Sequence, residues 1–326
     1  MPSSFKGGGE GAAVLLAARG EARRRFGLLG VPHDAATTIG NPGARYGPGA
    51  LREMLVDWFG RRVRDGKIAD LERGILDLSE VEVLDFGDVE ISYADPAAAV
   101  EETAAAVAQI IAAGALPISI GGDHGVTFPA FRALHDATPG PVGLVQLDAH
   151  ADLDPGNPRQ GRYSGSSGMR RALELERLQG DHLVQIGLRG YTSVEQYEIG
   201  ERLGVPRITC AEVEAVGAAA VAARTLDLLK GVDAVHLTVD LDVLDPGSAP
   251  GSGWAEPAGM RTADLFAIVR ALAPRLAGFD VAELNPLFDA RSGATAILAA
   301  RLVLDLITAD LSDGGRGGAA RLPQGA

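Results

Sequence analysis

The stretch LVQLDAHADLD, residues 144–154, decides the fold of this chain, because a buried strand ends in it and a row of polar side chains begins. Its apolar beginning is typical of a strand that is covered on both faces. Asp148, His150, Asp152 and Asp154 then follow at every second position. Because residues two apart in an extended chain face the same way, we expect the first three to converge on one side.

The rest of the chain alternates in the same way between short apolar runs and longer helical stretches. One helical stretch, 95–114, begins with Asp95 as a possible cap and Pro96 in the first turn, and it stops at Gly114. Eight apolar runs are predicted strands: 25–31, 80–86, 115–121, 142–148, 182–188, 206–211, 233–240 and 277–284. This alternation predicts an α/β fold in which helices cover both faces of a parallel sheet.

Composition limits the partners and the compartment of the protein. The chain has 326 residues, of which 46% are hydrophobic, and a formal net charge of -13. Such a chain can bury a large core, and it offers no basic stripe for nucleic acid or an anionic membrane. No apolar run reaches the roughly 18 residues of a membrane span. The single cysteine, Cys210, argues against a disulfide framework and favours the cytoplasm.

Neither an internal repeat nor a linker divides the chain, so we expect one domain over residues 26–310. The segment 1–25 contains the apolar patch AAVLLAA, which is too short for a signal peptide and is followed rather than preceded by arginines. We expect this segment to be loosely ordered. The Gly-rich stretch 311–326 is expected to be a flexible tail.

Polar clusters follow four of the predicted strands. They are GGDHG (121–125), DAHAD (148–152), DLD (240–242) and ELNP (283–286). In open parallel sheets ligands bind at the carboxyl ends of the strands, so these clusters are expected to meet at one rim. Buried carboxylates gathered without compensation are costly, and a cation is therefore expected among them.

The ligand types at this rim indicate which cation it is. Oxygen ligands with two histidines and no thiolate favour Mn²⁺ or a similar divalent ion over structural zinc. Four carboxylates and two imidazoles exceed what one small ion usually takes from a protein, so two ions are predicted. Such a pair lowers the pKa of a water between them and makes it a nucleophile near neutral pH.

These motifs, together with VDLDVLDPGSAPGSGWAEPAG (239–259), resemble the signature motifs of the ureohydrolases, the family of arginases, agmatinases and guanidino-acid hydrolases. The resemblance runs from about residue 26 to 308. PGARYGPGALRE (42–53) and VQIGLRGYTSVE (184–195) are closer to the agmatinase-type branch than to arginases. The resemblance implies a three-layer α/β/α fold with an eight-stranded, mostly parallel sheet. It also implies two Mn²⁺ per subunit, hydrolysis of a guanidino group to urea and an amine, and a homo-oligomer, either a trimer or a hexamer.

Site residues are carried over from the family motif by motif. The resemblance implies that one ion is held by His124, Asp148, Asp152 and Asp240. It implies that the other is held by His150, Asp148, Asp240 and Asp242, with Asp148 and Asp240 bridging. Nickel or cobalt would fit the same ligands.

Two further roles follow from the same resemblance. Glu283 would bind the guanidinium of the substrate through a charge-assisted pair, and Asp242 would carry a proton to the departing amine. Asp123 and Asp245 would orient the metal ligands.

The chain departs from the family pattern in the substrate pocket. Ser166 or Ser167 stands where many members have a histidine that helps proton transfer, and Trp254 replaces a small threonine. A bulky ring there is expected to shrink or reshape the pocket, which points to agmatine or a shorter guanidine as substrate. Asp154 would suit a cationic substrate tail, whereas Arg159 or Arg162 would suit a carboxylate.

Two alternatives to a guanidino hydrolase stay open. The first is a related C–N hydrolase acting on a formimino compound or another amidine, which would release formamide instead of urea. The second is a metal-binding homologue without turnover, for which the missing histidine is the argument.

Overall fold

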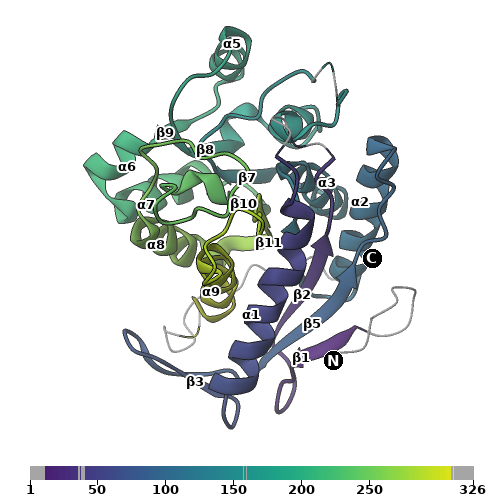
Figure 1. The fold of residues 1–326 in the computed structure, drawn as a ribbon, viewed down its shortest axis with the longest axis vertical. Coiled ribbons are helices and arrows are strands. Elements are labelled where there is room, and N and C mark those ends of the chain that lie inside the picture. Colours follow the sequence, from purple (N-terminus) through teal and green to yellow (C-terminus); the bar gives the residue numbers. More distant parts are fainter. Residues whose placement is uncertain are drawn as a thin grey trace.

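Within the residues that the structure describes, nine strands form one sheet through the molecule (Figure 1). The computed structural model describes residues 12–35, 37, 41–156, 158, 160–309 and 311. Across the sheet the strand order is β1 (Ala13–Leu16), β5 (Val81–Asp88), β2 (Arg24–Val31), β6 (Leu116–Gly121), β11 (Leu276–Ala282), β10 (Ala234–Asp240), β7 (Val142–Leu147), β8 (Leu183–Leu188) and β9 (Arg207–Thr209). Every neighbouring pair is parallel except β1 and β5.

The eight predicted strands are confirmed, with small shifts at their ends, but the count of eight is wrong by one strand. The ninth strand is β1, which pairs antiparallel with β5 at the edge of the sheet. It lies inside segment 1–25, which was expected to be loosely ordered. Its sequence AVLL places Leu16 in the core, so burial of apolar side chains explains why this short segment pairs with the sheet.

Helices cover both faces of the sheet, as predicted. One core cluster unites side chains of α1 (Gly47–Arg62), α7 (Ala218–Leu228), α8 (Thr262–Leu272) and α9 (Ala294–Thr308). Two other clusters contain side chains of α2 (Pro96–Ala112) and α3 (Thr127–Ala137). Figure 1 shows α1 and α2 with strands β2 and β5 between them. The predicted start of α2 is confirmed, because the Asp95 side chain accepts from the backbone N–H groups of Ala97 and Ala98.

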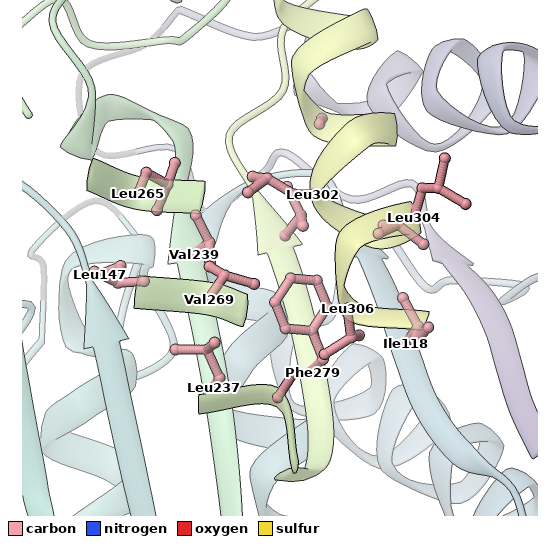
Figure 2. Packing of buried hydrophobic residues seen from close by; sticks show 14 of the residues in the cluster. Ile118, Leu147, Leu237, Val239, Leu265, Val269, Phe279, Leu302, Leu304 and Leu306 are labelled. Carbon is pink, nitrogen blue, oxygen red and sulfur yellow. The ribbon is translucent and has the colours of Figure 1, made fainter. Parts of the chain in front are cut away.

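The largest core cluster holds the central strands against α8 and α9. Figure 2 shows Phe279 of β11 and Leu237 and Val239 of β10 facing Val269 of α8 and Leu306 of α9. Phe279 is fully buried. Burying such a side chain stabilises the fold by roughly 1.5–3 kcal/mol. This packing fixes the positions at which β10 and β11 end.

Smaller elements complete the fold. A two-stranded hairpin of β3 (Lys67–Asp70) and β4 (Gly74–Asp77) lies outside the main sheet, and the sequence did not predict it. Three helices flank the second half of the sheet: α4 (Gly168–Ala172), α5 (Val194–Leu203) and α6 (Cys210–Val216). Among the described residues, no helix has the length and apolar character needed to cross a membrane.

A single domain over 26–310 stays a prediction. Of the tail predicted over 311–326, only Leu311 belongs to the described residues.

Candidate metal centre

The order of the strands explains how four separate polar clusters come together. β6, β11, β10 and β7 are consecutive neighbours in the sheet, and each is followed by one cluster. His124 follows β6 in the short 3-10 helix η2 (His124–Val126), and Asp242 follows β10 in η5 (Leu241–Val243). Asp148, His150 and Asp152 follow β7, and Glu283 follows β11. Because these strands are parallel, all four carboxyl ends lie at one edge.

His124 stands among three carboxylates. Its Nδ1 lies 2.9 Å from Asp148 Oδ2, 2.7 Å from Asp152 Oδ2 and 3.3 Å from Asp240 Oδ2. One ring nitrogen carries at most one proton, so it cannot satisfy three carboxylate oxygens by donation. His124, Asp148 and Asp240 also bring their ligand atoms close enough together to hold a metal ion.

A second group of potential ligands shares Asp148 with the first. His150 Nδ1 lies 3.0 Å from Asp242 Oδ2 and 3.5 Å from Asp148 Oδ1. Asp148, His150 and Asp242 form the second potential metal site. The two oxygens of Asp148 thus face different histidines, which is the arrangement of a bridging ligand. Asp240, the other expected bridge, belongs only to the first of these two groups.

The electrostatics of the cluster show that cations fit it. Burial and the charges of Asp242 and Asp148 raise the pKa of Asp240 well above its usual value. Burial and the charge of Asp148 raise the pKa of Asp152 to about 6. Burial alone would lower the pKa of His150, but hydrogen bonds to Asp148 and Asp242 raise it to about 12. Crowding of buried carboxylates thus disfavours the charged forms of Asp240 and Asp152, and two divalent ions would balance the four aspartates.

A hydrogen-bond chain below the site fixes the tautomer of His124. Asp280 Oδ1 accepts from the hydroxyls of Thr238, at 2.6 Å, and Thr127, at 3.0 Å. The only proton of the Thr238 hydroxyl is then directed at Asp280, so its oxygen accepts from His124 Nε2, 2.9 Å away. Nε2 of His124 therefore carries a proton, which leaves Nδ1, the nitrogen that faces the carboxylates, as the one available to a metal ion.

The amino-acid sequence did not predict this chain of hydrogen bonds. His236 is buried in β10 with Nε2 2.5 Å from Asp280 Oδ2. The only signal for Asp280 in the sequence is an acid inside an otherwise apolar strand, AGFDVA. A fully buried carboxylate needs such partners.

Glu283 faces the same cluster from the end of β11. Its Oε1 accepts from the His124 backbone N–H at 3.0 Å, and its own N–H donates to the Gly122 oxygen at 2.8 Å. Burial and the charge of Asp123 raise the pKa of Glu283 to about 8. Glu283 and Asp152 both have positive φ, 61° and 51°, which is strained backbone for residues other than glycine.

Glu283, Asp240 and Asp242 line a cavity of about 850 Å³, together with both site histidines. Trp254 also lines it, with its ring edge-on to His150 at 5.8 Å between centroids and its Nε1 donating to Glu256 Oε2 at 2.9 Å. Trp254 as a whole is 41% exposed. Trp254 therefore shapes one wall of the cavity but does not close it.

The serine loop is arranged differently from the expectation. Ser167, proposed for the pocket, is fully buried in a capping box with Ser164 at the start of η3 (Gly165–Ser167). Gly165 and Ser166 line the cavity instead. The tight 3-10 turn, rather than an extended segment, sets which serine faces the site.

The charged residues of the cavity wall differ in how they are paired. Asp154 Oδ1 accepts from Gln196 Nε2 at 2.8 Å. Arg207 pairs with Glu201 and lies 4.3 Å above the ring of Tyr197. The other lining arginine, Arg189, donates to the backbone oxygens of Gly187, Asp242, Val243, Leu244, Glu256 and Pro257.

The remaining predicted residues lie as follows. Arg162 pairs with Glu174, and Arg159 lies outside the described residues. Asp245 accepts from the backbone N–H groups of Gly247 and Gly259, so it holds the loop after η5 in place. Asp123 accepts from Gly125 N–H beside His124.

Comparisons with known proteins agree with this site. The family model described as "Arginase family" matches residues 24–308. The chain is 35% identical over 286 residues to guanidinopropionase of Pseudomonas aeruginosa, covering 87% of this chain and 86% of that protein. It is 32% identical over 289 residues to formimidoylglutamase of Halalkalibacterium halodurans, covering 86% of each.

A third relative is similar in sequence and in structure. Proclavaminate amidinohydrolase of Streptomyces clavuligerus is 31% identical over 287 residues, covering 86% of each chain. The solved structure of that name superposes with a TM-score of 0.77 at 28% identity, covering 95% of this chain and 99% of that one.

Proposed function

Since the chain belongs to the arginase family, we propose that it hydrolyses the guanidino group of a small compound to urea and an amine, using two divalent ions. The observation that carries the proposal is the pair of potential metal sites sharing Asp148, with Glu283 facing the same cavity. When bound, the two ions would lower the pKa of a water between them and so supply the nucleophile.

The residues of the chain take the remaining roles. His124, Asp148, Asp152 and Asp240 would hold one ion, and His150, Asp242 and the shared Asp148 and Asp240 would hold the other. The Asp242 carboxylate is fixed by the Ala149 N–H at 3.1 Å and by His150, which suits a group that passes a proton to the departing amine.

Glu283 would hold the guanidinium. Its pKa is raised because it is buried among negative charges, and a guanidinium placed against it would offset that cost through a paired hydrogen bond. The strained backbone at Glu283 holds the carboxylate in a fixed position, and such positioning is a main source of catalysis.

The wall of the cavity favours a cationic or neutral substrate tail over a carboxylate. Asp154 and Glu256 line the wall, and the arginines among the described lining residues, Arg189 and Arg207, already donate to carbonyls and to Glu201. Aromatic rings such as Trp254 add faces that attract cations. These features support agmatine, or a shorter guanidine without a carboxylate, as substrate.

A formimino compound is the second candidate. It is favoured by the serine loop, in which Gly165 and Ser166 face the cavity where many ureohydrolases have a histidine, and by the similarity to a formimidoylglutamase. Serine does not carry protons near pH 7 as imidazole does. Formamide instead of urea among the products would identify this reaction.

Three further features belong to the proposal. We propose manganese as the metal, with nickel or cobalt as possible occupants of the same ligands. We also propose a homo-oligomer, trimeric or hexameric, as the resemblance to the family implies, and a cytoplasmic location, which the single cysteine favours.

A substrate panel tests the function. The purified protein, loaded with Mn²⁺, is assayed for urea and formamide with agmatine, guanidine, 3-guanidinopropionate and N-formimino-L-glutamate. Urea from agmatine or guanidine, with little from 3-guanidinopropionate, is expected. Preference for the carboxylate substrate would contradict the charge argument, and no turnover of any compound by protein that holds two ions would support a homologue without catalysis.

Variants of the wall sharpen this test. Glu256→Gln and Asp154→Asn should raise KM for agmatine and leave guanidine turnover nearly unchanged, because guanidine has no tail to reach these side chains. An equal effect on both substrates would show that the two acids act on the site as a whole.

A further inference from the structure

A second cavity lies on the other side of the loop that carries Ser166. It measures about 30 Å³ and is lined by residues of β2, α2, η2 and α3 and of the loop that leads into α4. Ser164 and Ser167 face this second cavity, whereas Gly165 and Ser166 face the metal-site cavity. The loop 164–167 is therefore a thin wall between the two.

The guanidinium of Arg171 is buried at the second cavity. Arg171 belongs to α4 and is only 3% exposed. Its Nη2 pairs with Glu174 Oε1 at 2.8 Å, but Nε and Nη1 have no hydrogen-bond partner in the part of the chain that the structure describes. A buried charged donor without an acceptor is costly, so these two nitrogens require a partner that the protein itself does not supply.

His33 supplies a second polar atom of the same kind. It is 9% exposed, with Nδ1 3.7 Å from Asp123 Oδ2, and its Nε2 finds no partner among the described residues. Burial acts to lower the pKa of His33, but the hydrogen bond and charge of Asp123 raise it above the usual value. In its protonated form the ring would present an Nε2–H donor to the cavity and offset the charge of Asp123 on the same wall.

The local charge around Arg171 is opposite to that of the whole chain. Arg162, Arg170 and Arg171 lie within ten residues of sequence, and Glu174 pairs with two of them. Burial and the positive charges of Arg162 and Arg170 lower the pKa of the Arg171 guanidinium. In a protein with a net charge of -13, these three arginines stand against one acid, Glu174, close to the cavity.

We propose that this second cavity binds a small monovalent anion, such as chloride or formate, between Arg171 and His33. The size limits the ligand, because a cavity needs at least about 10–15 Å³ to hold one water, so 30 Å³ holds an anion of a few atoms and excludes the guanidino substrate. The anion would accept from the unpartnered donors and fix the wall that carries Ser166. The inference does not depend on the catalytic activity of the metal site.

Thermal unfolding of the metal-loaded protein tests the proposal. Sodium chloride and sodium formate should raise the Tm in a saturable way, by about 2 °C or more once the anion exceeds its Kd tenfold. Sodium gluconate at equal ionic strength is the control for salt effects, because its anion is too large for the cavity. An equal rise with gluconate would overturn the proposal.

Two matched variants locate the effect. Arg171→Gln should abolish the saturable rise, whereas Arg162→Gln, which removes the same charge from an exposed arginine of the cluster, should keep it. A rise that persists in Arg171→Gln would place the anion elsewhere, for instance at the metal ions, and would overturn the assignment.

Crystals give a readout that does not depend on the variants folding. In wild-type crystals soaked in sodium bromide, anomalous scattering should show bromide in contact with Arg171 and His33. Water alone in the cavity, at a bromide concentration that saturates the effect on Tm, would contradict the proposal.

Discussion

Thr238→Val is expected to weaken metal binding although residue 238 is not a metal ligand. Thr238 Oγ1 accepts from His124 Nε2 at 2.9 Å and donates to Asp280 at 2.6 Å. Valine has nearly the same shape and suits a strand, so the change removes the hydroxyl with little effect on packing. His124 loses the acceptor that fixes its tautomer and its orientation.

The size of the effect follows from this geometry. Leaving the buried Nε2–H without an acceptor costs about 1–3 kcal/mol, and the loss of such an outer contact typically weakens metal binding 10- to 100-fold. We therefore expect the Kd for Mn²⁺ to rise by about 10- to 100-fold at the site of His124. Calorimetric titration of the metal-free protein with Mn²⁺ measures this change.

Thr127→Val is the matched control. Thr127 also donates to Asp280, at 3.0 Å, and is equally buried, but its hydroxyl contacts Thr238 rather than the His124 ring. Its loss should lower the free energy of unfolding while leaving the Kd for Mn²⁺ within about threefold. Equal weakening of metal binding by both variants, or by neither, would refute the idea that the Thr238 hydroxyl positions His124.

Three further predictions address other parts of the molecule. Glu283→Gln should raise KM and lower kcat for the guanidino substrate while both ions stay bound, and unchanged kinetics would show a structural role. Phe279→Ala should lower the free energy of unfolding by about 3–5 kcal/mol in urea titrations, because the ring is fully buried; a loss below 1 kcal/mol would argue against this packing. Burial alone would raise the pKa of Asp70, but hydrogen bonds from Arg73 lower it from 3.8 to about 2. The stability that Asp70 adds over Asp70→Asn should therefore be present at neutral pH and shrink as the pH falls from 3.8 towards 2, and a pH-independent difference would exclude an ionic contribution.

The sequence predicted the strands well because they depend on local pattern, and the side chains proposed as metal ligands are placed by the same pattern. Asp148, His150 and Asp152 directly follow an apolar run, so their place at the end of a buried strand could be read from three or four neighbouring residues. What the pattern does not contain is the order of the strands. The spatial order β6, β11, β10, β7 across the sheet is what brings His124 next to Asp240.

The failures have physical reasons of two kinds. Ser166 and Ser167 differ by one residue, and whether the loop turns as a 3-10 helix or runs extended decides which of them faces the cavity. The role of Asp280 depends on three partners from one strand and one helix, Thr238 and His236 of β10 and Thr127 of α3, and such long-range contacts leave no trace in spacing. The edge strand β1 was missed because four apolar residues acquire a partner only when the sheet has formed.

Metal stoichiometry tests the central claim most directly. Elemental analysis of the full chain, dialysed after loading with Mn²⁺, should give two ions per chain for the wild type and for Asp154→Asn, whose side chain lines the cavity outside both ligand groups. Asp148→Ala should lose both ions, because the two groups share this carboxylate. A wild-type protein with one ion or none, or an Asp148→Ala protein that keeps two, would contradict the account.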